Sequence, residues 1–175
     1  MLLLLGAGAA ASFAQENARP SLAQIEVAAL SQLEKELVPL AEAMPEDKFN
    51  FAPTGGEFKN VRTFALQMRH IATVNYEISA GLLGEKPPID VGTHENGSDS
   101  LATKTAIVKY LKDSFAYSHR AVQTVNAQNG TEVVQQPWKD TRLSLANTLV
   151  WHSYDHYGQA VVYLRLNGIV PPASR

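Results

Sequence analysis

The sequence predicts an all-α protein that folds as a four-helix bundle with long connections between helices. Four separate segments place apolar residues at steps of three and four, which is the period of an amphipathic helix. Stretches rich in Pro, Gly and Asn separate these segments, and no segment shows the sustained alternation of a strand. Four such helices in one chain are typical of a bundle.

The first helix is expected over about residues 21–43, with Ser21 as its N-cap. Pro39 should kink this helix or shorten its last turn. The loop that follows contains Phe49 and Phe51, which we expect to pack against the core. The apolar stripe of the helix consists of Leu22, Ile25, Ala29, Leu33, Leu37 and Leu40.

The second and third helices are expected over about residues 60–83 and 100–129. Gly84 ends the second helix in the usual way, and Asn129 with its following glycine ends the third. Residues 84–99, between the two, have no periodicity and predict an exposed crossover. The fourth helix runs from an N-cap at Asp140 or Thr141 to about residue 166.

The N-terminal segment 1–14, MLLLLGAGAAASFA, resembles a signal peptide cleaved before Gln15. It is too short to span a bilayer, and it lacks the basic residues that begin a signal peptide, so its start is expected to be truncated. The alternative is an apolar tail or a lipid-facing anchor. We expect an exported protein, periplasmic or secreted, with a linker over 15–20 and a single domain over 21–175.

Composition narrows the possible chemistry. The formal net charge of −2 gives no electrostatic reason to expect nucleic acid or an anionic membrane as a partner. The chain has no cysteine, which excludes a thiol nucleophile, a disulfide and a thiolate metal site. Any metal ligands must therefore be nitrogen or oxygen atoms.

The fourth helix contains the motif WHSYDHYGQ, with His152 and His156 four residues apart. Residues at this spacing share one helical face, and two imidazoles one turn apart can chelate a single divalent ion. The alternative is a pair of core histidines satisfied by hydrogen bonds. Ser153 stands where a zinc protease would have glutamate, and Asp155 lies on another face, so protease chemistry is disfavoured. The inward face is indicated by Leu145, Leu149, Ala160 and Tyr163.

A third ligand must come from another helix, and three histidines are candidates. His70 and His119 both border apolar stripes, and spacing ranks His70 only slightly higher. His119 is more simply explained as a half-buried surface residue. His94 lies in the crossover and is expected to be solvated.

Two stretches of the chain together resemble the DinB superfamily: MPEDKFNFAPTGGEFKNVRTFALQMRHIA and HSYDHYGQAVVYLRLNGIVPP. The resemblance implies a four-helix bundle in which His70, His152 and His156 bind one divalent transition metal. It also implies a possible homodimer. Members of the superfamily include transferases that activate bacillithiol or mycothiol, whereas others have no established reaction.

Three imidazoles leave one coordination position open, which is the arrangement of a catalytic metal rather than a structural one. Zinc, nickel and iron suit this ligand set equally well. The expected function is therefore a metal-dependent enzyme acting on an unknown small molecule, either as a thiol transferase or as a hydrolase. The first alternative is a non-catalytic metal- or ligand-binding module, and the second is a helical interaction protein.

Residues near the motif suggest further roles. Gln159 could contact the metal's water or a group behind the ligands, Glu77 is an exposed carboxylate or an acceptor behind the ligands, and Arg165 is part of a structural ion pair or a helix-end charge. An open pocket with another polar group would favour catalysis. A site closed by Trp151, Tyr154 or Tyr157 would favour binding without turnover.

Overall fold

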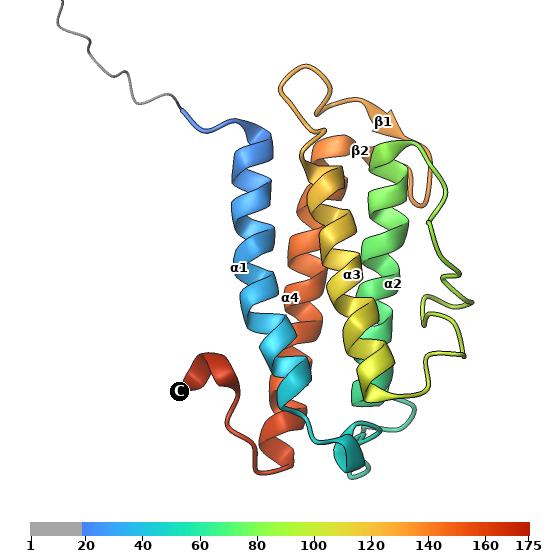
Figure 1. The fold of residues 1–175 in the computed structure, drawn as a ribbon, viewed down its shortest axis with the longest axis vertical. Helices are drawn as coiled ribbons and strands as arrows, with labels where there is room; N and C mark the ends of the chain where they lie inside the picture. The colour runs from blue at the N-terminus through green and yellow to red at the C-terminus, as the bar shows by residue number, and fades with distance from the viewer. Residues whose placement is uncertain (1–18) are drawn as a thin grey trace, which may run out of the picture.

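The computed structural model describes residues 19–175, so the predicted signal segment 1–14 and most of the linker 15–20 lie outside the described residues. Four long helices confirm the predicted all-α class (Figure 1). They are α1 (Leu22–Ala43), α2 (Phe64–Leu83), α3 (Lys104–Val122) and α4 (Arg142–Leu166). Smaller elements are the 3₁₀ turns η1 (Glu46–Lys48) and η2 (Pro172–Ser174) and the strands β1 (Val133–Val134) and β2 (Asp140–Thr141).

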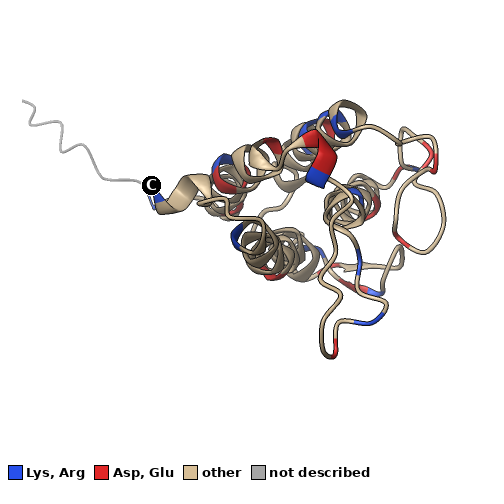
Figure 2. Cartoon of the chain, turned by 90° about the horizontal axis from the view of Figure 1, so that it is seen from below, with Lys and Arg blue, Asp and Glu red and all other residues tan. Residues whose placement is uncertain are grey.

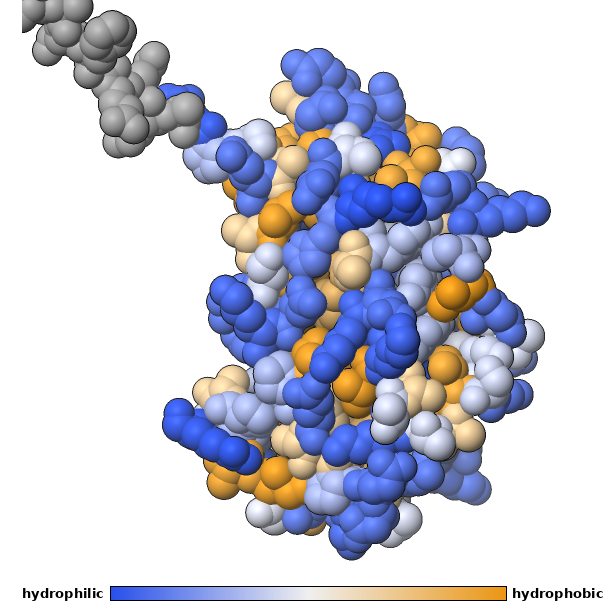
Figure 3. All heavy atoms as spheres, viewed as in Figure 1, coloured by the Kyte–Doolittle hydropathy of each residue, from blue (hydrophilic) through white to orange (hydrophobic). Residues whose placement is uncertain are grey.

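The helices surround one apolar core. Helix α2 packs on α3 and α4, and α1 packs on the other side of the same two helices. Viewed along the bundle, the charged residues lie on the outer faces of helices and in loops (Figure 2). The face drawn in Figure 3 is largely hydrophilic, with small groups of hydrophobic residues between the charges. Among the described helices, none is both long enough and apolar enough to cross a membrane.

Two of the predicted helix starts are confirmed and two are wrong. Ser21 caps α1 with a reciprocal capping box, and Thr141 caps α4. Helix α2 begins after Thr63 rather than near residue 60: Asn60 has a φ of 66°, which a right-handed helix excludes, and the Thr63 hydroxyl caps the helix by accepting from the Leu66 amide. Helix α3 begins after Thr103, whose hydroxyl accepts from the Ala106 amide.

Helix α3 also ends earlier than predicted, at Val122 instead of residue 129. The side chain of Asn126 accepts from the amides of Gln128 and Asn129, and the Asn129 side chain accepts from the Asn126 amide. Asparagine side chains that bond nearby amides compete with the helical backbone, and this explains the early end. Helix α1, in contrast, continues past Pro39 to Ala43.

Buried polar pairs align α2 with α3. Hydroxyl and amide side chains from the two helices meet where the packed faces exclude water. Because a buried polar group left unpaired costs about 1–3 kcal/mol, these pairs favour one register of the two helices. They are Thr73–Tyr110 at 3.0 Å, Asn75–Ser114 at 3.3 Å and Ser79–Ser118 at 2.9 Å.

The connection between α3 and α4 folds back over α2. Strands β1 and β2 pair in antiparallel fashion, and the segment between them contacts α2 at Gly81. A Cβ atom added at Gly81 would overlap the carbonyl oxygen of Gln136. The absence of a side chain at Gly81 therefore lets this connection, which carries Trp138, lie directly on the helix.

Replacement of Gly81 by alanine is expected to destabilise the fold by about 1–3 kcal/mol, because backbone atoms must move to relieve the overlap. Gly158 in α4 is the matched control, since nothing lies within 4 Å of a Cβ added there. Gly158→Ala is expected to stabilise the protein by about 0.4–1 kcal/mol. Urea unfolding midpoints of both variants check this, and equal shifts would contradict the close contact at Gly81.

Candidate metal centre

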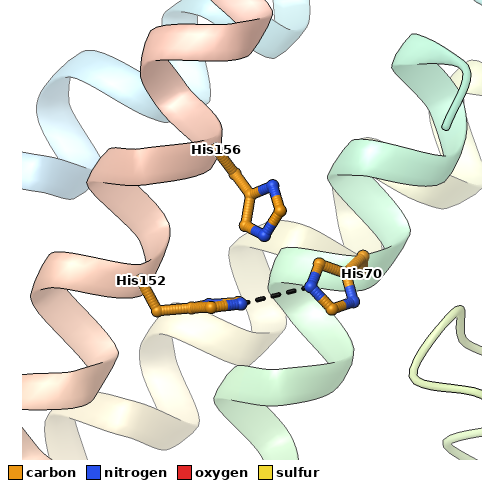
Figure 4. A group of neighbouring side chains, drawn as sticks. All are labelled: His70, His152 and His156. Atoms are coloured by element: carbon orange, nitrogen blue, oxygen red, sulfur yellow. Dashed lines mark hydrogen bonds between the residues drawn. The ribbon is translucent and has the colours of Figure 1, made fainter. Parts of the chain in front are cut away.

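The three predicted histidines meet in the middle of the bundle. His70 comes from α2, and His152 with His156 from α4; the ring nitrogens that they can offer to one ion all lie within 4.8 Å of one another. The Nε2 atoms of His70 and His152 are 3.1 Å apart. Figure 4 shows the three rings directed toward a common point between the helices.

Burial keeps these rings neutral. His70 is 4% exposed and His156 8% exposed. Desolvation is the main cause that lowers the pKa of all three histidines, and it brings the pKa of His152 to about 3 and that of His156 to about 4. Neutral imidazole is the form that binds a metal, so no proton has to leave these rings at neutral pH.

The distances suit a divalent ion. Two nitrogen ligands at 2.0–2.1 Å from a tetrahedral ion lie about 3.3 Å apart, close to the observed separation of the two Nε2 atoms. The cluster does not satisfy its own polar atoms, since Nδ1 of His152 and Nδ1 of His156 are buried without a hydrogen-bond partner. An ion at the Nε2 atoms would leave both Nδ1 atoms unpaired, so an ion is supported by the distances and by the three converging rings. The group is compatible with metal binding.

The tautomer of His70 is fixed by a loop residue that sequence reasoning missed. Nδ1 of His70 lies 2.8 Å from the carbonyl oxygen of Glu95. A carbonyl oxygen only accepts, so Nδ1 carries the proton and Nε2 presents its lone pair to the cluster. Such a partner outside the ligand set orients the ring and raises its basicity.

The loop that carries Glu95 is held in place by two arginines. Arg69 of α2 donates to the carbonyl oxygens of Gly97 and Ser98, both at 3.0 Å, and Arg62 donates to Asn96. Gly97 is buried, at a φ of 71° that glycine adopts readily. The prediction of a merely exposed crossover is therefore wrong for this stretch, which packs on α2.

The other histidines stay away from the cluster. His94 is exposed in the crossover, as expected. His119 lies 2.8 Å from a carboxylate oxygen of Glu34 on α1 and is half-buried at the surface. This placement agrees with the expectation that neither His94 nor His119 belongs to the histidine cluster.

Other sequence candidates have structural roles. Gln159 bonds Gln67 and Asp155 and makes no hydrogen bond to a histidine of the described chain. Glu77 is half-buried rather than exposed, and burial raises its pKa. Arg165 is exposed in the last turn of α4, where a positive charge favours the helix end.

One hollow is lined by a histidine of the cluster, and a second is lined by Gln67 and Gln159, each three residues from one of the histidines. We call the first the indole hollow: its volume is about 340 Å³ and its lining is Val74, Glu95, Trp138, Asp140, Leu145, Thr148, Trp151 and His152. We call the second the amide hollow: its volume is about 590 Å³ and its lining is Asn60, Val61, Arg62, Leu66, Gln67, Asn96 and Gln159.

The aromatic residues of α4 do not close the site. Trp151 is 59% exposed and lines the indole hollow, through which His152 can be reached. Tyr154 and Tyr157 pack against each other with ring centroids 6.0 Å apart, and neither lines a hollow beside the histidines. The arrangement is that of an open site with a further polar group, Glu95, beside the ligands.

Replacement of His70 or His152 by alanine is expected to abolish stoichiometric metal binding, because two imidazoles hold an ion weakly. Elemental analysis after equilibration with zinc, nickel or ferrous iron checks this, with far-UV circular dichroism to confirm that the helices persist. His119→Ala is the control and should keep about one equivalent of metal. Full metal content in both cluster variants would rule out the three-histidine site.

Arg69→Met is expected to weaken metal binding by about tenfold, because the released loop no longer holds the Glu95 carbonyl against His70. Competition with a chromogenic chelator measures the affinity. Arg120→Met is the matched control, since Arg120 pairs with Glu85 at a distance from the site. Identical affinities in the two variants would show that the loop does not orient the ring.

Comparison with known proteins agrees with the fold and the histidine cluster. The sequence profile of the DinB superfamily matches residues 29–160, which include all three histidines and most of the four helices. No curated protein sequence matches the chain significantly. Because the profile covers most of the chain, the protein belongs to the DinB superfamily.

Proposed function

We propose that this protein is a metal-dependent enzyme that hydrolyses a small organic substrate. The observation that carries the proposal is the shared wall of the indole hollow, which both His152 of the cluster and Glu95 line. A binding module would need the histidines but no accessible carboxylate next to them.

A divalent ion held by His70, His152 and His156 would supply Lewis acidity toward a substrate carbonyl and toward water. The protein's own contribution begins with ring orientation, since the Glu95 carbonyl fixes His70. The bundle core then keeps the three rings neutral and turned inward. The hollow limits the substrate to a small molecule, because its volume of about 340 Å³ is near the lower end for ligand pockets.

Glu95 is the proposed general base and acid. Its Oε2 atom lies 3.9 Å from Nδ1 of His70, and its side chain is 42% exposed, so it lies beside one ring of the cluster and is open to solvent. As a water oxygen bonds to the substrate's acyl carbon, the carboxylate takes the proton. It returns that proton to the leaving oxygen or nitrogen as the acyl bond breaks.

A second candidate reaction is thiol transfer, which the amide hollow favours. A transferase needs room for two substrates, and this second space has one cation, Arg62, and four side-chain amides in its lining. The sulfur of a thiol would bond to an electrophilic carbon as the leaving group departs with a proton. The predicted export of the chain would separate it from cytosolic thiols, and for that reason we place hydrolysis first.

Metal-loaded protein is expected to hydrolyse 4-nitrophenyl esters or anilides, and Glu95→Gln should lower kcat by about 10²–10⁴-fold while metal content is unchanged. Glu77→Gln is the control, because its half-buried carboxylate lines neither hollow beside the histidines. Release of nitrophenol and elemental analysis are measured on the same samples.

Two results would contradict hydrolysis. One is an unchanged rate in Glu95→Gln with full metal, and the other is the absence of turnover in all metal forms. A parallel assay follows loss of free thiol in the presence of a chloro-nitroaromatic electrophile. Thiol consumption without hydrolysis would move the assignment to thiol transfer.

A further inference from the structure

The indole hollow contains both tryptophans of the chain. Trp138 comes from the connection between β1 and β2, and Trp151 from α4, so residues far apart in sequence supply the two indoles. They are 39% and 59% exposed. Apolar surface of this size is normally buried, and two exposed indoles at one hollow indicate a ligand surface.

The charged side chains that line the hollow all have one sign. Its lining includes two carboxylates, Glu95 and Asp140, and no lysine or arginine. The Asp140 carboxylate accepts from the Thr141 amide at 2.7 Å and from the Ser144 hydroxyl at 2.6 Å, and the hydroxyl is the larger cause that lowers its pKa. The Glu95 carboxylate lies 3.9 Å from Nδ1 of His70, and burial lowers the pKa of that ring.

Apolar side chains complete the lining. Val74 from α2 and Leu145 from α4 are buried beneath the opening, so the floor of the hollow is apolar. Indole faces attract cations through their quadrupole, and carboxylates add an attraction of the same sign. An anionic ligand would meet repulsion from both carboxylates and find no cationic partner in this lining.

We propose that the indole hollow binds the ammonium or guanidinium group of a substrate that also has an apolar body. The apolar part lies against Val74 and Leu145, and the cation lies between the indoles and the carboxylates of Glu95 and Asp140. One part of this assignment rests on the proposed function: the placement of the scissile bond of the same molecule next to His152.

The test uses benzyltrimethylammonium, which has no lone pair and therefore cannot ligate a metal. Benzyl alcohol is the neutral comparison and phenylacetate the anionic one. Because both tryptophans line the hollow, quenching of intrinsic fluorescence reports its occupancy directly. The ammonium is expected to bind at least tenfold more tightly than benzyl alcohol, and its affinity should fall as salt concentration rises.

Variants identify the residues responsible, with affinities measured by calorimetry. Trp151→Leu keeps an apolar side chain but removes the indole face, and it is expected to weaken ammonium binding at least fivefold. Asp140→Asn keeps the acceptor oxygen for the Thr141 amide but removes the negative charge, and it should also weaken ammonium binding. Phe58→Leu is the control, since Phe58 is an aromatic residue, 50% exposed, outside the lining of the hollow.

Three outcomes would overturn the proposal: no binding of the ammonium at 10 millimolar, tighter binding of phenylacetate, or equal weakening by Phe58→Leu and Trp151→Leu. The titrations are run on metal-free and metal-loaded protein, with metal content measured separately. Ammonium binding without turnover would count against the enzymatic function alone. Turnover of neutral esters without ammonium binding would count against the cation site alone.

Discussion

The hydrogen bond from Nδ1 of His70 to the carbonyl oxygen of Glu95 is the interaction on which the site depends. It joins the core of the bundle to the loop between α2 and α3 across 25 residues of sequence. One bond sets the tautomer of a candidate ligand and also places the Glu95 carboxylate at the indole hollow. Arg69 and Arg62 hold the loop, so the geometry of the cluster depends on contacts outside it.

Stability and function impose opposite demands on the centre of this bundle. Two buried imidazoles and one half-buried imidazole, with two unpaired Nδ1 atoms, reduce the stability that the same volume of apolar side chains would provide. Elsewhere apolar residues fill the core and the polar pairs between α2 and α3 are bonded, while Gln67, Arg69 and Arg142 each keep one buried polar atom without a partner. Polar side chains that converge in a bundle core at a cost in stability are typical of a binding site.

Helix periodicity predicted the four helices well but their ends less well. Ser21 and Thr141 were recognisable as caps because they directly precede an apolar period. The start of α2 depends on the positive φ of Asn60, and the end of α3 on hydrogen bonds between asparagines in the following turn. Propensity does not decide such short-range competition, because several conformations of the same residues differ little in free energy.

The sequence by itself determined the class of fold and the pairing of His152 with His156, because residues four apart on a helix share a face whatever surrounds them. From spacing alone, the third histidine could have been His70 or His119, and only the family resemblance separated them. Tertiary structure decided that His70 meets the pair whereas His119 bonds Glu34. Glu95 and the indole hollow were not predicted, since a loop without periodicity carries no signal of which helix it will contact.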